Sequence, residues 1–556
     1  MRALRLGGRL KTLAEIFRNP QLRRLELAWC GYYLGEWTQF VALSIWAFRE
    51  GGATAVGALG LIRMGAAAIA LPFGGMLTDR YPRQRVLLGM YLARATILAG
   101  MSAALGMSSP RPLIFVLAAL ASVAVAPVRP ATMSLVPLLA RTPSELVAAN
   151  VASSTLEGVG TFLGPVLGGV LAAGRNVAIA VGVAAVTYVV CAALVAGIRR
   201  HGDVATRPRM ERGPLAELLR GARTIAEDRD PRLVILLFSS QALVRGILNV
   251  LIVVASVELL HAGDAGVGWL NAALGLGGLA GGVVALGLVG RRKLGLPFGL
   301  ALVTWGAPIA LIGVWPHMAW ALACIGVVGV GNAVLDVSGF TLLQRTVDEH
   351  VLGRVLGAFE VLVAVAVAVG SAIGSLQVAQ IGIRPALVVT GVFLPALALL
   401  NARGLRRIDR TSAVPSRQLE LLSAVPLFEP LPVTTLERLS FRLHEVHGRA
   451  GTPLITKGTP GEHFYVIASG EVDVIDEGRL VTTLGPGDYF GEIALLRNVE
   501  TTADCVPRTD AELYALDREN LVAAVGGDVC SAGVAGDVVA RRLTELANLA
   551  GATGSN

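Results

Sequence analysis

The chain has 556 residues, of which 54% are hydrophobic and 16% are charged. A soluble globular protein carries roughly 25% charged residues, so this composition excludes a wholly soluble protein. The formal net charge is +8, but the basic residues lie mainly in loops predicted to share one membrane face, so they orient the protein and do not indicate nucleic-acid binding.

Apolar runs long enough to cross a bilayer as a helix recur from about residue 23 to about residue 402. The first run follows a basic N-terminal segment and is too long, and too far into the chain, for a cleaved signal peptide. We predict an all-α polytopic membrane domain at residues 1–402, with halves of about 1–198 and 232–402 joined by a cytosolic loop at 199–231. The twelve predicted spans lie near residues 23–48, 54–78, 85–107, 112–135, 149–173, 176–198, 232–259, 266–290, 296–314, 318–342, 353–379 and 384–402.

The charged loops predict the orientation of these spans. One face is rich in Arg and Lys, whereas the opposite face carries isolated charges such as Arg49, Arg175 and Arg384. By the positive-inside rule the rich face is cytosolic, which places both termini in the cytosol of a plasma or inner membrane. The basic residues of the cytosolic face are Arg80, Arg83, Arg85, Arg199, Arg200, Arg207, Arg209, Arg291, Arg292, Lys293, Arg403, Arg406 and Arg407.

Six ionisable residues within the spans are candidates for transport or proton coupling, because charges in hydrocarbon are costly and need a partner or a watery cavity. Counted at the helical rise, Glu36 and Arg63 both lie about 20 Å from the cytosolic surface, so we predict that they pair. The other four are Arg129 and Glu157, about 10 Å from that surface, and Asp336 and Glu360, at the corresponding places in the second half.

Among these candidates, Glu36 is the residue that we expect to couple protons to transport. A carboxylate that alternates between a salt bridge and a dry pocket changes its affinity for protons, and that change couples proton binding to substrate release. The alternative is that the charged residues form static pairs that fix helix orientation, or lie at the membrane interface. Arg94 and Arg245 also lie within spans, and the sequence assigns them no partner.

The loop between the second and third spans reads Gly75-Met-Leu-Thr-Asp79-Arg80-Tyr-Pro-Arg83-Gln-Arg85. It resembles the signature loop of the major facilitator superfamily, in position and in membrane face. The resemblance implies a cytosolic gate formed by Gly75, Asp79, Arg80 and Arg83, where the aspartate secures the loop against the opposite half by facing a helix N-terminus. The equivalent loop of the second half, at residues 290–293, lacks the aspartate, so gate symmetry is not implied.

The fifth span contains Gly164, Pro165 and Gly168. This sequence resembles a motif of exporters and proton-driven antiporters in the superfamily, which implies a helix that bends beside the proline. Dense helix packing is the alternative. Short stretches that include Gly35 and Glu36 also resemble the branch of enterobactin exporters and macrolide-efflux proteins, which implies efflux of a small molecule without naming it.

The character of the chain changes after a basic linker at residues 403–417. Short helices are followed by segments of alternating apolar residues between Gly-rich turns, such as residues 463–467 and 470–474. This pattern predicts a cytosolic β-roll, or jelly roll, with flanking helices at residues 418–556. Its last part, to about Ala547, is expected to be a helical lid or lever.

The segment Phe490-Gly491-Glu492-Ile493-Ala494-Leu495-Leu496 resembles the phosphate-binding cassette of cyclic-nucleotide-binding domains. The resemblance implies a regulatory ligand, cyclic AMP or another cyclic nucleotide. Gly491 permits close backbone approach, amides through Ala494 and Leu495 receive the phosphate, and Glu492 accepts a ribose hydroxyl.

One position departs from the cassette pattern. The family places an arginine where this chain has Thr501, and usually a small hydroxyl residue next, where Thr502 stands. Loss of a charge-assisted contact to a buried phosphate costs on the order of a hundredfold in affinity. Either Arg497 substitutes for it, or the domain is a fixed docking or gating element that keeps only the fold.

The cysteines and the other reactive residues indicate no catalytic centre. Cysteines occur at positions 30, 191, 324, 505 and 530 without pairing or metal-ligand spacing, so we predict free thiols. The sequence has no phosphate-cradling loop of the ATPase kind and no nucleophile constellation. We therefore predict no enzyme activity, no catalytic residues, no metal site and no cofactor.

These features together predict a secondary transporter that works by alternating access in the lipid bilayer. We expect an exporter of a small molecule that is regulated by the cytosolic domain. Its coupling ion is expected to be a proton, with another ion as the alternative. The alternative is a membrane-anchored cyclic-nucleotide sensor or protein-docking scaffold that does not transport. The sequence leaves open whether the protein is a monomer or a dimer.

Overall fold

The computed structural model describes residues 19–140, 143–174, 176–198, 214–288, 291, 293–347, 349–411, 416–428, 431 and 433–526. The chain divides into two compact units, residues 1–411 and 412–556. Several expected features lie outside the described residues: the basic N-terminal segment, Arg175, residues 199–213 of the loop at 199–231 with Arg199, Arg200, Arg207 and Arg209, Gly290 and Arg292, Cys530, and the lever beyond residue 526.

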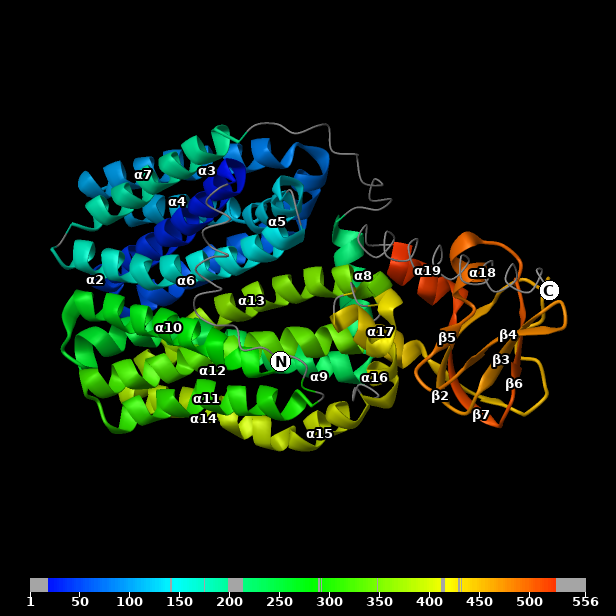
Figure 1. The fold of residues 1–556 in the computed structure, drawn as a ribbon. Coiled ribbons are helices and arrows are strands. Elements are labelled where there is room, and N and C mark those ends of the chain that lie inside the picture. The colour runs from blue at the N-terminus through cyan, green and yellow to red at the C-terminus, as the bar shows by residue number, and fades with distance from the viewer. Residues whose placement is uncertain are drawn as a thin grey trace. The chain divides into compact units, whose positions relative to one another are not determined.

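The first unit is helical throughout its described residues, as predicted (Figure 1). Its two halves form bundles that lie side by side, and the second half follows the amphipathic helix α8. The first half contains α2 (Pro20–Arg80), α3 (Arg83–Gly106), α4 (Arg111–Val123), α5 (Val128–Leu139), α6 (Pro143–Ala173) and α7 (Val177–Ala196), and α8 is Pro214–Glu227. The second half contains α9 (Arg229–Val254), the π-helix η1 (Ala255–Leu259), α10 (Gly263–Ala285), the short η2 (Leu286–Leu288), α11 (Gly295–Val314), α12 (Met318–Thr346), α13 (Glu349–Ile381), α14 (Ile383–Leu400) and α15 (Ala402–Thr411).

Eleven helical segments of the described chain are long and apolar enough to cross a membrane. The first, Pro20–Thr78, has 59 residues and would be about 90 Å long if straight, far more than a bilayer is thick. It is broken at Gly51 and Gly52, where the backbone is not helical and Gly52 has φ +60°. Because this region of φ favours glycine, the pair makes the turn between the first two predicted spans.

Other irregularities in the spans were not predicted. The fourth span is interrupted between α4 and α5, where Pro127 precedes the second piece. Helix α15, which follows the last span, packs on the start of α11 through Asp409. The Asp409 carboxylate accepts hydrogen bonds from the backbone N–H of Gly295 at 2.7 Å and of Leu296 at 3.3 Å. A side-chain acceptor at a helix start stabilises that helix.

The second unit is the predicted two-sheet roll. One antiparallel sheet has the order β1-β7-β2-β5 and the other has β4-β3-β6, with two apolar cores at Phe464 and at Leu513. The strands are β1 (His444–Gly448), β2 (His463–Ser469), β3 (Val472–Asp476), β4 (Arg479–Leu484), β5 (Tyr489–Phe490), β6 (Asp504–Pro507) and β7 (Ala511–Asp517). The helices are α16 (Ser416–Ala424), η3 (Pro426–Phe428), α17 (Val433–Arg442), α18 (Glu492–Arg497) and α19 (Arg518–Gly526).

Candidate functional site

A buried charge cluster lies in the first half of the membrane unit. Arg63 Nη2, from the second segment of α2, donates to Glu36 Oε1 in the first segment at 2.9 Å. Arg94 Nη2, from α3, donates to the other carboxylate oxygen, Glu36 Oε2. The predicted Glu36–Arg63 pair therefore forms, and Arg94, which had no predicted partner, is the third member of the cluster.

The surroundings of Arg94 hold its guanidinium in place. Its Nη2 also donates to Gln39 Oε1 at 2.9 Å, and its Cζ lies 4.5 Å from the ring centroid of Tyr188 and 5.9 Å from that of Tyr32. Aromatic faces stabilise a cation at such distances. The Arg94 side chain is 1% exposed, whereas that of Glu36 is 25% exposed. A carboxylate surface facing hydrocarbon would be costly, so this exposure fits a water-accessible space.

The cluster contains two guanidinium groups and one carboxylate. Two cations beside Glu36 stabilise its ionised form.

A second polar network lies in the other half and centres on Asn332 of α12. Its Oδ1 accepts hydrogen bonds from Arg245 Nη2 at 2.7 Å, Trp305 Nε1 at 3.2 Å and Gln241 Nε2 at 3.4 Å. Its Nδ2 donates to Asp336 Oδ2 at 2.9 Å. Asn332 thus links Arg245, which had no predicted partner, to the predicted carboxylate Asp336.

The remaining predicted charges converge from the two halves. Arg129 of α5 lies within electrostatic range of Glu157 of α6 and of Glu360 of α13. Asp336 lies within range of Arg245, Arg129 and Glu157. Charged side chains that lie far apart in the sequence and in different bundles therefore influence one another electrostatically.

The halves pack closely at the end opposite the loop between α2 and α3. A Cβ added at Gly169 of α6 would lie 2.7 Å from the Cα of Gly268 in α10, and one at Gly57 would lie 2.5 Å from Ser375 Cβ in α13. Such distances leave no room for a side chain. Arg49 and Asp264 form a salt bridge across the same end.

The residues of the signature loop lie at the other end. Arg80 ends α2, and Arg83 begins α3 after a two-residue turn. Thr78 Oγ1 donates to the carbonyl of Gly75 at 2.7 Å, and the Arg80 guanidinium lies 5.9 Å from the ring of Tyr81. The Asp79 backbone is helical, but its side chain lies outside the described part of the chain, so its predicted gate contact stays a prediction.

The glycines of the fifth span pack against α2. A Cβ at Gly164 would lie 2.6 Å from Trp37 Cβ, and one at Gly168 would lie 2.6 Å from the carbonyl oxygen of Thr38. Thr38 Oγ1 also donates to the carbonyl of Gly164 at 3.1 Å. This geometry favours the alternative of dense helix packing, and the bending role assigned to Pro165 stays a prediction.

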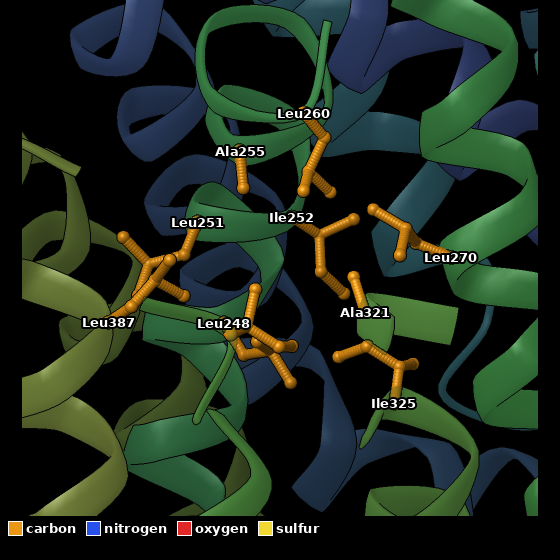
Figure 2. Close-up of a pocket in the computed structure, with 10 residues that line it drawn as sticks. Leu248, Leu251, Ile252, Ala255, Leu260, Leu270, Ala321, Ile325 and Leu387 are labelled. Atoms are coloured by element: carbon orange, nitrogen blue, oxygen red, sulfur yellow. The ribbon is translucent and has the colours of Figure 1, made fainter. Parts of the chain in front are cut away.

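A small cavity in the second half is no candidate for a substrate site. Figure 2 shows its lining side chains, among them Leu248, Ile252 and Ile325, and all ten lining residues are apolar. Its volume is about 10 Å³, which is room for about one water molecule. It therefore lacks both the size and the polar groups that a substrate needs.

In the second unit, the cassette residues surround the turn into α18. Gly491 has φ +91° and lies against the backbone of His463, whose carbonyl oxygen would be 2.6 Å from an added Cβ. Glu492, Ala494 and Leu495 are buried, whereas Ile493 is half-buried. The local backbone thus needs glycine at position 491 for both reasons.

Thr501, at the position of the family arginine, is committed to local hydrogen bonds. Its Oγ1 donates to the carbonyl of Thr456 at 2.6 Å and accepts from the backbone N–H of Thr459 at 3.1 Å. The side chain is buried, whereas Thr502 beside it is exposed. Arg518 of α19 donates to Oδ1 of Asn498, the residue that follows α18, at 2.5 Å and to the carbonyl of Gly461 at 3.1 Å.

Comparison with known families decides the identity of the chain. The model of the Major Facilitator Superfamily matches residues 27–370, more than half of the chain, and again residues 234–442. The chain belongs to the major facilitator superfamily. The model of the cyclic nucleotide-binding domain matches residues 445–526, so this facilitator is a multi-pass membrane protein fused to a C-terminal domain of that family.

Individual relatives match one part or the other of this facilitator. The crystal structure of a POT family transporter with a thioalcohol-conjugated peptide has a TM-score of 0.56 and 13% identity, over 70% of this chain and 96% of that one, which shows the fold. The cAMP-dependent protein kinase regulatory subunits of Aspergillus niger and Schizosaccharomyces pombe are each 32% identical, over 161 and 152 residues. These are 28% and 27% of this chain and 39% and 37% of those relatives, so the chain spans less than two fifths of their length.

One buried carboxylate of this facilitator escaped the sequence reasoning. Glu26, in the first turns of α2, is 2% exposed and accepts hydrogen bonds from Ser153 Oγ of α6 at 2.7 and 2.9 Å. Glu26 lies only three residues after the predicted start of the first span, and a charge so close to the end of a span can reach the membrane interface, so it did not stand out as an intramembrane charge. Asn332 was missed for another reason, because a neutral amide in a span carries no charge to draw attention.

Proposed function

We propose that this facilitator is a secondary transporter that exports a small molecule by alternating access, coupled to protons, under the control of a cyclic nucleotide bound by its C-terminal domain. The proposal rests on one observation above all, the partly exposed Glu36 held between the buried Arg63 and Arg94. A static ion pair would need only one arginine for the single carboxylate, because a second buried cation adds a cost of burial that Glu36 cannot fully neutralise.

Protonation of Glu36 would break its ion pairs with Arg63 and Arg94. When the arginines return to Glu36, they would compete with the proton for its carboxylate. If the outward-facing state separates Glu36 from Arg94, protons bind there and leave in the inward-facing state. Asn332, Asp336, Arg129, Glu157 and Glu360 supply polar groups for a substrate between the halves. Transport then exchanges protons for substrate, with no chemical reaction.

The two ends of the membrane domain act as gates in this proposal. The loop with Gly75, Asp79, Arg80 and Arg83 is the cytosolic gate, and the end closed by Arg49 and Asp264 is the extracytosolic gate. Close packing at the latter end supports an inward-facing arrangement. Both termini are cytosolic, with the transporter domain at residues 1–402, the linker at 403–417 and the regulatory domain at 418–556, in a plasma or inner membrane.

Regulation requires that the nucleotide bind one transport state more tightly than the other. The cassette residues 491–495, together with Thr501 and Thr502, form the proposed pocket for cyclic AMP or another cyclic nucleotide. The hydrogen bonds of the Thr501 hydroxyl to the backbone of Thr456 and Thr459 support a second candidate function, in which this domain is a docking or gating element without a ligand.

Reconstitution of the full-length protein tests transport. Proteoliposomes loaded with a defined panel of amphipathic small molecules are followed by mass spectrometry, with and without an imposed proton gradient. We expect flux of at least one compound that the proton gradient stimulates. Glu36→Gln should reduce this flux at least about tenfold, because it removes the charge that attracts both arginines, which costs more than the loss of one neutral hydrogen bond. Glu50→Gln is the matched control, since Glu50 lies on the same helix and pairs with the exposed Arg111.

The outcomes separate the two classes of function. Equal flux for Glu36→Gln and the parent under a proton gradient would remove Glu36 from coupling. Absence of flux for every compound would favour the membrane-anchored sensor or scaffold. Calorimetric titration of the full-length protein in detergent with cyclic AMP and cyclic GMP tests regulation, and heat from neither would leave the domain as a docking element.

A further inference from the structure

Three potential metal ligands meet on one face of the four-stranded sheet in the C-terminal unit. They are His444 of β1, His463 of β2 and Asp517 of β7, and one ligand atom from each lies within 4.8 Å of the other two. In the sheet order β1-β7-β2 the three strands are adjacent. His463 is paired directly with Asp517, and His444 is paired with Ala515, two residues away on the same face as Asp517.

The distances suit a metal ion. His463 Nε2 lies 3.3 Å from Asp517 Oδ1. Ligands bound to zinc at about 2.0–2.1 Å in a tetrahedron are separated by about 3.4 Å. The rings of His444 and His463 are 5.4 Å apart between centroids and nearly perpendicular, at 79°, so their nitrogens can approach one ion without stacking.

The donor set indicates the class of ion. Imidazole nitrogens together with one carboxylate favour zinc, nickel or copper over calcium or magnesium, which prefer oxygen ligands. Asn520 Nδ2 lies 3.5 Å from Asp517 Oδ2, whereas Oδ1 is the oxygen that lies 3.3 Å from His463. An outer partner of this kind orients a carboxylate ligand.

We propose that His444, His463 and Asp517 form a binding site for a divalent transition-metal ion, with Zn²⁺ the best fit and a fourth position open to water. The partial exposure of the cluster leaves that position reachable, since the side chains of His463 and Asp517 are 31% and 53% exposed. The ion would tie three strands together one residue before α19 begins. It would also fix His463, whose carbonyl lies against the cassette residue Gly491.

The simpler interpretation is a surface contact between a histidine and a carboxylate, with the second histidine nearby by chance. It predicts weak and unsaturable metal binding that no single substitution removes. The two interpretations therefore differ in stoichiometry and in the effect of each ligand.

The test uses the full-length protein in detergent, free of any histidine tag. Zn²⁺ is titrated by calorimetry, and bound Co²⁺ is followed by its visible absorption, which reports the ligand geometry. We expect one ion for each chain in the parent, and at least about tenfold weaker binding in His463→Ala, in Asp517→Asn and in His444→Ala, since even the loss of outer partners weakens metal sites by tenfold or more.

The matched control is His447→Ala. His447 lies on the same strand as His444 but three residues later, so it points to the opposite face of the sheet, and its removal should leave affinity unchanged. The melting temperature without metal shows whether each variant folds. If a histidine variant does not fold, Asp517→Asn is the deciding variant, because it keeps the shape of an exposed side chain. Parent and Asp517→Asn proteins with the same Zn²⁺ affinity, or a parent that binds no Zn²⁺, would overturn the proposal.

Discussion

Arg49 of α2 forms a salt bridge with Asp264 of α10, and this pair joins the two halves of the membrane domain at their closely packed end. Both side chains are partly exposed, at 29% and 20%. Asp264→Asn should therefore loosen this end by about 1 kcal/mol, which is about a fivefold rise in the share of molecules open there.

Cysteine labelling measures this opening. Ser371 of α13 is 1% exposed and packs against Gly60 of α2 in the other half. Ser371→Cys, in a background without the native cysteines, should therefore react with an impermeant maleimide only when the halves separate. Asp264→Asn should speed this labelling. Glu50→Gln, which breaks an outer pair with Arg111 within one half, should not, and equal labelling rates in both variants would contradict the gate.

The three hydrogen bonds accepted by Asn332 should stabilise the folded membrane domain. Asn332→Leu leaves the donors of Arg245, Trp305 and Gln241 without their acceptor, and each such loss in a buried site costs about 1–3 kcal/mol. We expect a melting temperature several degrees lower in detergent. The comparison variant is Asn401→Leu. Asn401, which directly follows α14, donates to the carbonyl of Leu397 one turn earlier, so its loss should change the melting temperature less.

An arginine at position 501 should restore phosphate binding if the cassette accepts cyclic nucleotides. Thr501→Arg supplies the cation that the family places there, and a charge-assisted contact of about 1.5–3 kcal/mol raises affinity by about tenfold to a hundredfold. Calorimetric titration of the full-length variant with cyclic AMP measures the gain. Thr502→Arg adds the same charge on the exposed neighbour, so an equal gain there would point to net charge in place of a specific contact.

Removal of the Asp409 carboxylate should destabilise the start of α11. Asp409→Ala leaves the backbone N–H groups of Gly295 and Leu296 without an acceptor, and loss of such a cap costs about 1 kcal/mol. Hydrogen exchange of the peptide around these residues should speed up, less so in Asp409→Asn, which keeps one oxygen. Unchanged exchange in Asp409→Ala would show that the helix start is held by packing alone.

Much of the architecture could be predicted because it depends on local sequence. Span positions follow from apolar runs of bilayer length, and the roll follows from alternating residues between glycine turns. The Glu36–Arg63 pair was also predicted, since equal depth in adjacent spans is a matter of counting residues. The break at Pro127 and the π-helix at Ala255–Leu259 escaped prediction, because small deviations from a helix depend on the neighbours that pack against it.

By itself the sequence determined which segments cross the membrane and which residues carry charge into it. Only the tertiary structure decided the partners: Arg94 for Glu36, Asn332 for Arg245, Asp264 for Arg49, and the meeting of His444, His463 and Asp517. The physical reason is distance along the chain. A helix or strand forms from contacts a few residues apart, whereas these pairs join residues tens to hundreds of positions apart, and their approach depends on how whole helices and strands pack.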